Sequence, residues 1–420
     1  MSDATSRPGP LAGLRVLELA DETGQYCGKL LGDLGADVIK IEPPGGAATR
    51  HIGPFVDDVP HHDRSLAFWH YNTSKRGVTL NLETQDGRAL FRRLAAGADV
   101  VLETFRPGYL ASLSLGYDDL RADNPALVMC ALTPFGQTGP WRDFRTSDLL
   151  HMAAGGEMAS CGYDAADVAD APPIAPGGGN AWHMGCHYAY ISIMAALVFR
   201  SVSGQGQYID VSIHEACALT TEAAIANYIY RGETLIRHTG RHHAAAPTPR
   251  TQFLAKDGKY VTALISGGLN PRNVKNLAAL MDAYGMAGDL NDPKYQDPKI
   301  IAASTSHIID GLLADFIASL PADEIYHAGQ SRGFTWASVR APEELLDDGH
   351  LQDRDFWKRV EHPELGRDVV YPGESAIFSD SPWKIVRRAP LLGEHNAEIF
   401  RDDLGLSPGE LTMLAENGVI

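Results

Sequence analysis

The chain has 420 residues, of which 44% are hydrophobic and 21% charged, a composition typical of a soluble globular protein with two domains. Its formal net charge of −17 argues against nucleic acid as a partner, although a local basic cluster can still hold an anionic ligand. The sequence has neither a run of 18 apolar residues nor an apolar stretch at its start, so we expect no membrane span and no signal peptide.

The five cysteines are scattered along the chain and form no CxxC pair. This pattern argues against a disulfide framework or a zinc cage, and it is typical of proteins in the reducing cytoplasm. His214 and Glu215 at the start of one predicted helix, and His242 and His243 further on, show no spacing characteristic of a metal site. We therefore expect a cytoplasmic protein without a bound metal.

The first 140 residues alternate short apolar strands with helices. Strands are predicted at 14–20, 37–42, 78–82, 99–105 and 126–135, and helices at 26–36, at 84–98 and near Tyr117. Strands that alternate with helices form a parallel sheet covered on both faces, which predicts a Rossmann-like α/β domain. The turn after the first strand reads DETGQYCG rather than GxGxxG, and no GxxxxGK[ST] motif is present. We therefore expect a Rossmann-like scaffold that does not bind NAD.

The second half of the chain has a different pattern. A strand is predicted at 207–213 and a helix from 215 to 230, followed by a basic, irregular linker. The stretch TQFLAKDGKYVTALI predicts a hairpin, and two or three helices follow up to about Gly333. The tail returns to loop and helix. These elements predict a second, smaller α+β domain.

A Pro/Gly-rich loop runs into a long apolar helix between Pro172 and Arg200. Asn180, Trp182 and His183 lie at this junction, with His187 one turn further on. A loop that delivers polar side chains to the N-terminus of a helix is a common place for binding or catalysis. No carboxylate lies in this junction.

Several motifs in this order carry a resemblance: LAGLRVLELA, CGKLLGDLGADVIKIEPPGGAATR, NTSKRGVTLNL, DVVLETFRPGYLASLSLGYDDL, NPALVMCALTPFGQTGP, SGQGQYIDVSIHEA and RAPLLGEHN. The chain resembles family III CoA-transferases, which include formyl-CoA, carnitine and benzylsuccinate enzymes and related acyl-CoA racemases. The resemblance implies a large Rossmann-like domain built from 1–215 and 340–420, with the linker and small domain at 216–339. It also implies an intertwined, interlocked homodimer.

The resemblance further implies that CoA binds at the large domain, as part of the substrate rather than as a permanently bound cofactor. CoA needs cations and helix N-termini for its phosphates, and ligands of open α/β sheets bind at the carboxyl ends of strands. Acidic Glu22 and Ser112 depart from the family pattern, so phosphate contacts are fewer or redistributed. The expected CoA-binding residues are Glu22, Thr23, Gly24, Lys75, Arg76, Thr104, Phe105 and Arg106.

The transferases of this family attack the acyl-CoA with an aspartate that directly precedes the helix matching 184–200. Without gaps this Asp falls on Trp182, and with a small shift on Asn180, so no placement lands on an acid. The histidine that racemases add near Ser147 is also missing. Asn180 can still donate a hydrogen bond to a thioester oxygen, and His183 can act as a general acid or base. Glu157 and Asp148 are interpreted as solvated or capping acids.

Three functions remain open. The first is a CoA-transferase that moves CoA between an acyl-CoA thioester and a carboxylic acid, with an atypical site that lacks the usual Asp. The second is a CoA-thioester isomerase, dehydratase or lyase on the same scaffold, using acid/base chemistry of His183. The third is a non-catalytic homologue that binds CoA esters. In each case the partners are acyl-CoA and organic acids, not nucleic acid or membrane.

Overall fold

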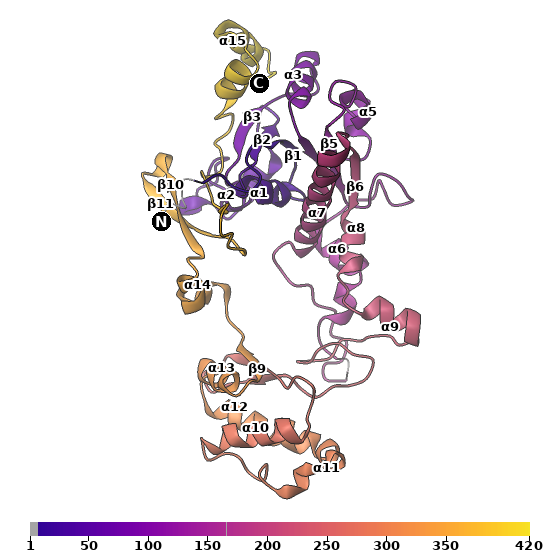
Figure 1. The fold of residues 1–420 in the computed structure, drawn as a ribbon, viewed down its shortest axis with the longest axis vertical. Coiled ribbons are helices and arrows are strands. Elements are labelled where there is room, and N and C mark those ends of the chain that lie inside the picture. The colour runs from indigo at the N-terminus through magenta and orange to yellow at the C-terminus, as the bar shows by residue number, and fades with distance from the viewer. Residues whose placement is uncertain (1–6, 165) are drawn as a thin grey trace. The chain divides into compact units, whose positions relative to one another are not determined.

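The computed structural model describes residues 7–164 and 166–420 (Figure 1). The chain divides into two compact units. Unit 1 consists of the residues up to Gly155 together with Pro176–Thr220 and Gly349–Ile420, and unit 2 of Gly156–Ala175 and Thr221–Asp348. Compared with the boundaries expected from the sequence, unit 2 begins and ends slightly later and also takes in the segment 156–175. Among the described residues, no helix is both long and apolar enough to cross a membrane.

Unit 1 is built on a six-stranded sheet whose strands all run parallel. The strands are, in spatial order, β3 (Arg76–Thr79), β2 (Asp37–Glu42), β1 (Arg15–Leu19), β4 (Val100–Glu103), β5 (Val128–Thr133) and β6 (Tyr208–Ser212). The strand order 3-2-1-4-5-6 is that of a doubly wound Rossmann sheet. The predicted Rossmann-like fold is therefore confirmed. The third strand begins two residues before its predicted start at 78, because Arg76 pairs beside Ile39 of β2.

Unit 1 also contains helices, several of which lie beside this sheet, such as α1 and α7 (Figure 1). They are α1 (Gln25–Asp33), α2 (Leu66–Tyr71), α3 (Gln85–Ala96), α4 (Tyr109–Ser112), α5 (Tyr117–Leu120), α6 (Asp148–Ala154), α7 (Asn180–Ser203), α8 (Ile213–Leu219), α14 (Gly349–Asp353) and α15 (Pro408–Glu416). The start of α3 follows from its sequence, since the Thr84 hydroxyl accepts a hydrogen bond from Gly87 N. The long helix α7 contacts α1, α8 and β5.

The single helix predicted for 215–230 is wrong, because the chain there forms two helices. The first, α8, ends at Leu219, and the second, α9 (Ala224–Arg231), lies in unit 2. Between them Glu222 adopts a left-handed backbone conformation with φ of 54°. Such a conformation cannot continue an α-helix.

Unit 2 holds a three-stranded antiparallel sheet and its own core. The strands are β7 (Gln252–Leu254), β8 (Tyr260–Leu264) and β9 (Thr335–Ser338), and the helices after the hairpin are α10 (Pro271–Asp282), α11 (Pro298–Ala303), α12 (Ala314–Ser319) and α13 (Ala322–Ser331). The predicted hairpin is confirmed, but β9 was missed and the helices outnumber the predicted two or three. Trp336 of β9 is fully buried in this core.

The carboxyl-terminal segment covers the exposed edge of the main sheet at β3. The backbone N–H of Gly77 donates to Nδ1 of His395 at 3.1 Å, and that of Thr79 donates to Oδ1 of Asn396 at 2.9 Å. Phe400 lies in the same core as the strands. An uncovered edge strand exposes backbone N–H and C=O groups that can pair with other chains. Here the carboxyl-terminal segment accepts hydrogen bonds from two of these N–H groups.

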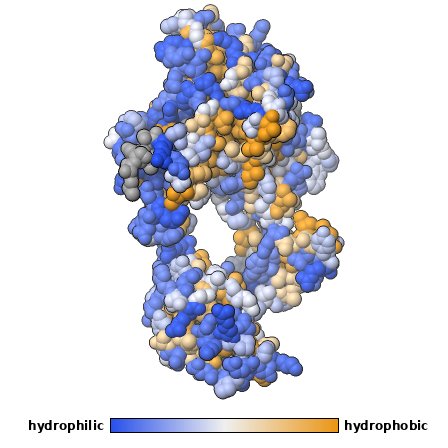
Figure 2. All heavy atoms as spheres, in the orientation of Figure 1, coloured by the Kyte–Doolittle hydropathy of each residue, from blue (hydrophilic) through white to orange (hydrophobic). Residues whose placement is uncertain are grey.

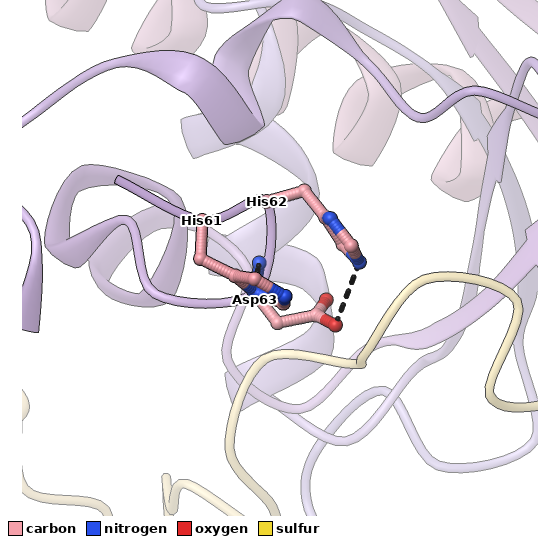
Figure 3. Close-up of side chains that lie close together, drawn as sticks. All are labelled: His61, His62 and Asp63. Atoms are coloured by element: carbon pink, nitrogen blue, oxygen red, sulfur yellow. Dashed lines mark hydrogen bonds and ion pairs between the residues drawn. The ribbon is translucent and has the colours of Figure 1, made fainter. Parts of the chain in front are cut away.

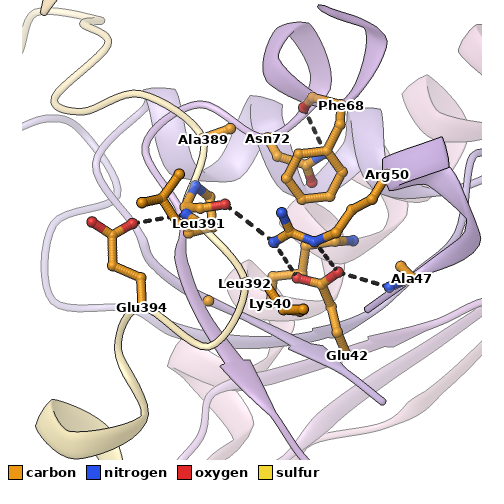
Figure 4. A network of polar contacts seen from close by, with 12 residues as sticks. Lys40, Glu42, Ala47, Arg50, Phe68, Asn72, Ala389, Leu391, Leu392 and Glu394 are labelled. Atoms are coloured by element: carbon orange, nitrogen blue, oxygen red, sulfur yellow. Dashed lines mark hydrogen bonds and ion pairs between the residues drawn. The ribbon is translucent and has the colours of Figure 1, made fainter. Parts of the chain in front are cut away.

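A buried ion pair between Arg50 and Glu42 also contacts the carboxyl-terminal segment, at Pro390 (Figure 4). The guanidinium of Arg50 donates to both carboxylate oxygens of Glu42 at 2.7 Å and to the carbonyl of Pro390 at 3.1 Å. Its charge also lies 4.0 Å from the centre of the Phe68 ring. A bidentate, buried pair of this kind fixes geometry as well as charge. An antiparallel hairpin of β10 (Trp357–His362) and β11 (Arg367–Pro372), which was not predicted, precedes this contact.

Glu18 lies at the centre of unit 1 as a buried carboxylate. Its Oε1 accepts from Lys40 Nζ at 2.9 Å, and its Oε2 lies 2.7 Å from Lys75 Nζ. Helix α1 passes so close to this cluster that a Cβ at Gly28 would lie 1.6 Å from Glu18 Oε2. Position 28 therefore requires glycine.

We predict that Gly28→Ala lowers the free energy of unfolding by about 1–3 kcal/mol, the usual cost of overpacking a core. Gly32→Ala in the same helix is the matched control, because its Cβ would meet its nearest neighbour at an ordinary 3.5 Å. Alanine also favours helix over glycine, so the control should be neutral or stabilising. Urea denaturation measures both, and equal losses would contradict this account of Gly28.

Candidate functional site

The first turn of α7 presents polar side chains but no acid of its own. The helix begins after Gly179, which has a φ of 71°, and its first turn contains no acidic residue. Asn180 donates from Nδ2 to the carbonyl oxygen of Gly177 at 2.7 Å. The Trp182 ring packs against the ring of His151, with 5.6 Å between their centres. As the sequence indicates, this turn therefore contains no acidic side chain.

His183 is held by two tyrosines from other helices. Its Nε2 lies 2.9 Å from the hydroxyl of Tyr71, the last residue of α2. The Tyr26 ring of α1 stacks on the imidazole, with 4.5 Å between ring centres and 29° between planes. Three helices thus meet at this imidazole, and its orientation is fixed on an edge and on a face.

The environment of His183 favours the neutral imidazole. Burial lowers the pKa of His183 below its ordinary value of 6.5, and the positive charge of His187 acts in the same direction. The carboxylate of Asp148 opposes both effects. At neutral pH His183 is therefore uncharged, and Tyr71, whose pKa burial raises, keeps its proton.

An acid from a different helix reaches the start of α7. Asp148 is the first residue of α6, and its Oδ1 accepts a hydrogen bond from the backbone N of Ala181 at 2.9 Å. A carboxylate is stabilised at this position by the positive end of the helix dipole. Asp148 is thus a capping acid, as predicted: it caps the start of α7 and is also the first residue of α6.

The loop after β1 closes against the end of β4. Oγ1 of Thr104 lies 3.0 Å from both the backbone N and Oδ1 of Asp21, and Oδ1 also accepts from the backbone N of Thr23 at 2.9 Å. A Cβ at Gly24 would lie 2.4 Å from Cγ2 of Thr104. The structure therefore brings together Thr23, Gly24 and Thr104, while Glu22 of the same loop is exposed.

Phe105 and Arg106 follow β4 at the carboxyl edge of the sheet. Phe105 packs on Tyr109 with 4.6 Å between ring centres, and Arg106 is exposed. A cavity of about 500 Å³ lies beside this turn and is lined by residues that include Glu103 and Tyr208. Burial raises the pKa of Glu103 to about 8, so this carboxyl is largely protonated at neutral pH.

Lys75 is not open to a ligand in this structure. It is fully buried, and its Nζ donates to the carbonyl oxygen of Gln25 at 2.8 Å and to Oδ1 of Asn72 at 2.9 Å. With Glu18 as third neighbour, the three donors of the ammonium group are satisfied. The geometry gives Lys75 a structural role, and contact with a CoA phosphate would require it to exchange these partners.

Arg76 is likewise paired within the chain. It donates from Nε to Oδ1 of Asp37 at 2.8 Å and from Nη1 to Oε1 of Glu398 at 2.8 Å. Asp403 lies 3.6 Å from its Nη2. This side chain ties β3 to β2 and to the carboxyl-terminal segment, so the predicted phosphate contact has no support from its geometry.

A family model described as CoA-transferase family III matches residues 11–396. The chain belongs to this family. Subunit BbsE of succinyl-CoA:(R)-benzylsuccinate CoA-transferase from Thauera aromatica is 34% identical over 92% of this chain and 92% of its own length. The beta subunit of succinyl-CoA–L-malate CoA-transferase from Chloroflexus aurantiacus is 31% identical over 100% of both.

A solved structure agrees with this assignment. The crystal structure of a CAIB/BAIF family protein from Brucella suis superposes with a TM-score of 0.81 and is 29% identical, covering 95% of this chain and 100% of that one. The resemblance on which the sequence predictions rested is confirmed. As a family III CoA-transferase, the protein is an enzyme of CoA transfer that handles the CoA thioester as a substrate.

Sequence reasoning missed the side chains that hold His183. Tyr26 and Tyr71 stand 157 and 112 positions before it, and no local pattern marks either one. The only signal was their position, since each directly adjoins a predicted family motif, CGKLLGDLGA or NTSKRGVTLNL. Asp21, which closes the loop onto Thr104, was also missed.

Proposed function

We propose that this chain moves CoA between an acyl-CoA thioester and a carboxylic acid without an acyl-enzyme on the first turn of α7. The observation that carries the proposal is the full-length similarity to proteins named as CoA-transferases. The absence of an acid from this turn supports the second part, since neither an amide nor an indole can form the anhydride of an acyl-enzyme.

The proposed chemistry needs no carboxylate from the enzyme. The acceptor carboxylate attacks the thioester carbonyl, a C–O bond forms, and the C–S bond breaks to release the CoA thiolate. The thiolate then attacks the acceptor carbonyl of the mixed anhydride, so a new C–S bond forms and the donor acid leaves. Atoms and charge balance without a further reactant. The protein must hold both acids close together and stabilise the oxyanions.

Tyr71 and Asn180 are the proposed donors for these oxyanions, and His183 is proposed to orient the Tyr71 hydroxyl. With its proton on Nε2, neutral His183 donates to the Tyr71 oxygen 2.9 Å away and directs the phenol proton outward. Asn180 uses one N–H for Gly177 and keeps a second for the thioester oxygen. Such donors act strongly because they are in place before charge develops.

For CoA we propose the loop of Glu22, Thr23 and Gly24, together with the end of β4 at Thr104, Phe105 and Arg106. The contact between Thr104 and this loop supports a joint site at the carboxyl edge of the sheet. Arg106 is exposed and is the preferred phosphate ligand. Lys75 and Arg76 are proposed to support this site indirectly, because their contacts within the chain fix the strands and turns next to it.

We expect Tyr71→Phe to slow CoA transfer about 10²–10³-fold, the loss typical of an oxyanion donor. His183→Ala should have a similar effect, because it removes the group that orients the Tyr71 hydroxyl. CoA affinity should survive in both variants. Arg106→Ala should instead weaken CoA binding about tenfold, which corresponds to ~1.4 kcal/mol. Mass spectrometry of CoA esters, with succinyl-CoA as donor and a panel of dicarboxylic acids as acceptors, measures the rate, and calorimetry measures CoA binding.

His187→Ala is the matched control for His183, because His187 lies one turn further along α7, where its Nδ1 contacts the His183 carbonyl oxygen at 2.7 Å and its ring meets the Tyr26 ring with 5.5 Å between centres. The rate of CoA transfer by the His187→Ala variant should stay close to that of the unchanged protein.

The same assay distinguishes the alternative functions. If a CoA ester changes mass without any acceptor, the function is single-substrate chemistry with neutral His183 as base. If CoA esters bind and nothing turns over, the chain is a non-catalytic homologue.

We also propose that the protein is an interlocked homodimer. Helix α7 leaves Val198 and Val202 open to solvent, and α9 leaves Tyr228 and Ile229 open, with Val202 88% exposed. Apolar residues also show on the surface in Figure 2. Exposed apolar surface of this kind is typical of an interface, and two relatives are named as subunits.

Light scattering at micromolar concentration should therefore report twice the chain mass of 45.4 kDa. Changing Val198 and Val202 to serine should shift the protein toward monomer, because each removes buried apolar area from the interface. Exposed Val386 offers a control on a different segment. A monomer in the unchanged protein would contradict the proposed assembly.

A further inference from the structure

Three side chains of metal-binding types converge in unit 2: Glu222, His242 and His243. Oε2 of Glu222 lies 3.2 Å from Nε2 of His242 and 3.4 Å from Nε2 of His243. The three atoms all lie within 4.8 Å of one another. Glu222 comes from the break between α8 and α9, and the histidines from the segment before β7. From the sequence we expected no metal site here, because His242 and His243 show no metal-binding spacing with each other or with Glu215.

A hydrogen bond of His242 determines which of its ring nitrogens faces Glu222. Its Nδ1 lies 3.0 Å from the carbonyl oxygen of His243, which can only accept, so Nδ1 carries a proton. In the neutral ring Nε2 then holds a lone pair, and this lone pair faces a carboxylate oxygen. Two acceptors 3.2 Å apart repel each other unless a positive charge lies between them. A metal ion held between the two atoms would supply that charge.

We propose that Glu222, His242 and His243 bind a divalent metal ion of the Zn²⁺ type. With metal–ligand bonds of ~2.0–2.1 Å, neighbouring ligands of a tetrahedral ion are about 3.3–3.4 Å apart. The two measured O–N separations, 3.2 and 3.4 Å, match this edge length. Two imidazoles and one carboxylate are a ligand set that zinc takes, with a fourth position left for water or a ligand.

The surroundings of the cluster fit a metal site. The bond from His242 Nδ1 to a backbone carbonyl is the outer contact that metal-bound histidines usually make, and it fixes which nitrogen faces the ion. His242 also lines a cavity of about 480 Å³ that includes Arg250 and apolar residues such as Leu269. The ion would tie the break after α8 to the linker that leads into β7.

A second cluster in the chain serves as the matched control. His61, His62 and Asp63 also bring three donor atoms together, with Asp63 facing His62 (Figure 3). There the donors are already engaged, because Asp63 Oδ1 accepts from Arg50 Nη1 at 2.9 Å and His61 Nδ1 accepts from Asp63 N at 3.1 Å. A nearby guanidinium also opposes a cation. We expect no metal at this second cluster.

The test uses the full chain, stripped with a chelator, loaded with Zn²⁺ and desalted before elemental analysis. One zinc per chain should remain in the unchanged protein and in a His61→Ala/His62→Ala control. Glu222→Gln and His243→Ala should each weaken Zn²⁺ binding at least tenfold in calorimetry, because each removes a ligand. Co²⁺ in place of zinc should give the visible absorption of a tetrahedral ion.

Circular dichroism of each variant shows that a loss of binding is not a loss of folding. Zinc that is absent from the unchanged protein would overturn the proposal. Equal binding in the Glu222→Gln and His243→Ala variants would overturn it as well. These readouts are independent of CoA transfer, so they stand whether or not the proposed transfer activity is found.

Discussion

The hydrogen bonds of the buried Lys75 ammonium group position the side chains around the start of α7. It has three acceptors, one from Glu18 of β1 and the others from Gln25 and Asn72. Gln25 directly precedes Tyr26, and Asn72 directly follows Tyr71, so satisfying one buried charge sets the positions of both tyrosines around His183. A buried charge that loses its partners is strongly destabilising, which makes this arrangement rigid. The site is thus a consequence of the core on which it stands.

The same demand for paired charge explains how the chain uses its cations. Arg50 and Arg76 both neutralise acids of β2 and its surroundings and at the same time bind the carboxyl-terminal segment, through Pro390 and Glu398. In a protein with a net charge of −17, these cations hold the two ends of the chain together rather than standing free for phosphates. Arg106, exposed at the edge of the sheet, remains available for an anionic ligand.

The sheet and helices such as α1, α3 and α7 could be predicted from the sequence because their signals are local: apolar runs for β1, β2 and β5, and a Thr84 cap for α3. The resemblance supplied the family. The absence of an acid from the first turn of α7 could also be seen in the sequence. The contacts of His183 and the pairing of Lys75 were not, because they join residues far apart whose burial depends on the finished core. The helix break at Glu222 was missed for a related reason, since a left-handed glutamate has no sequence signature.

In the proposed reaction, CoA transfer does not pass through an acyl-enzyme on α7. Asp148 is an alternative nucleophile, since its carboxylate reaches the helix start at Ala181. Hydroxylamine added during turnover converts an acylated carboxylate into a stable hydroxamate, which peptide mass spectrometry across residues 140–200 detects. We predict turnover with no hydroxamate on any of these peptides. A hydroxamate on Asp148, Glu157, Asp164, Asp167 or Asp170 would contradict the account and show that the nucleophile has moved rather than vanished.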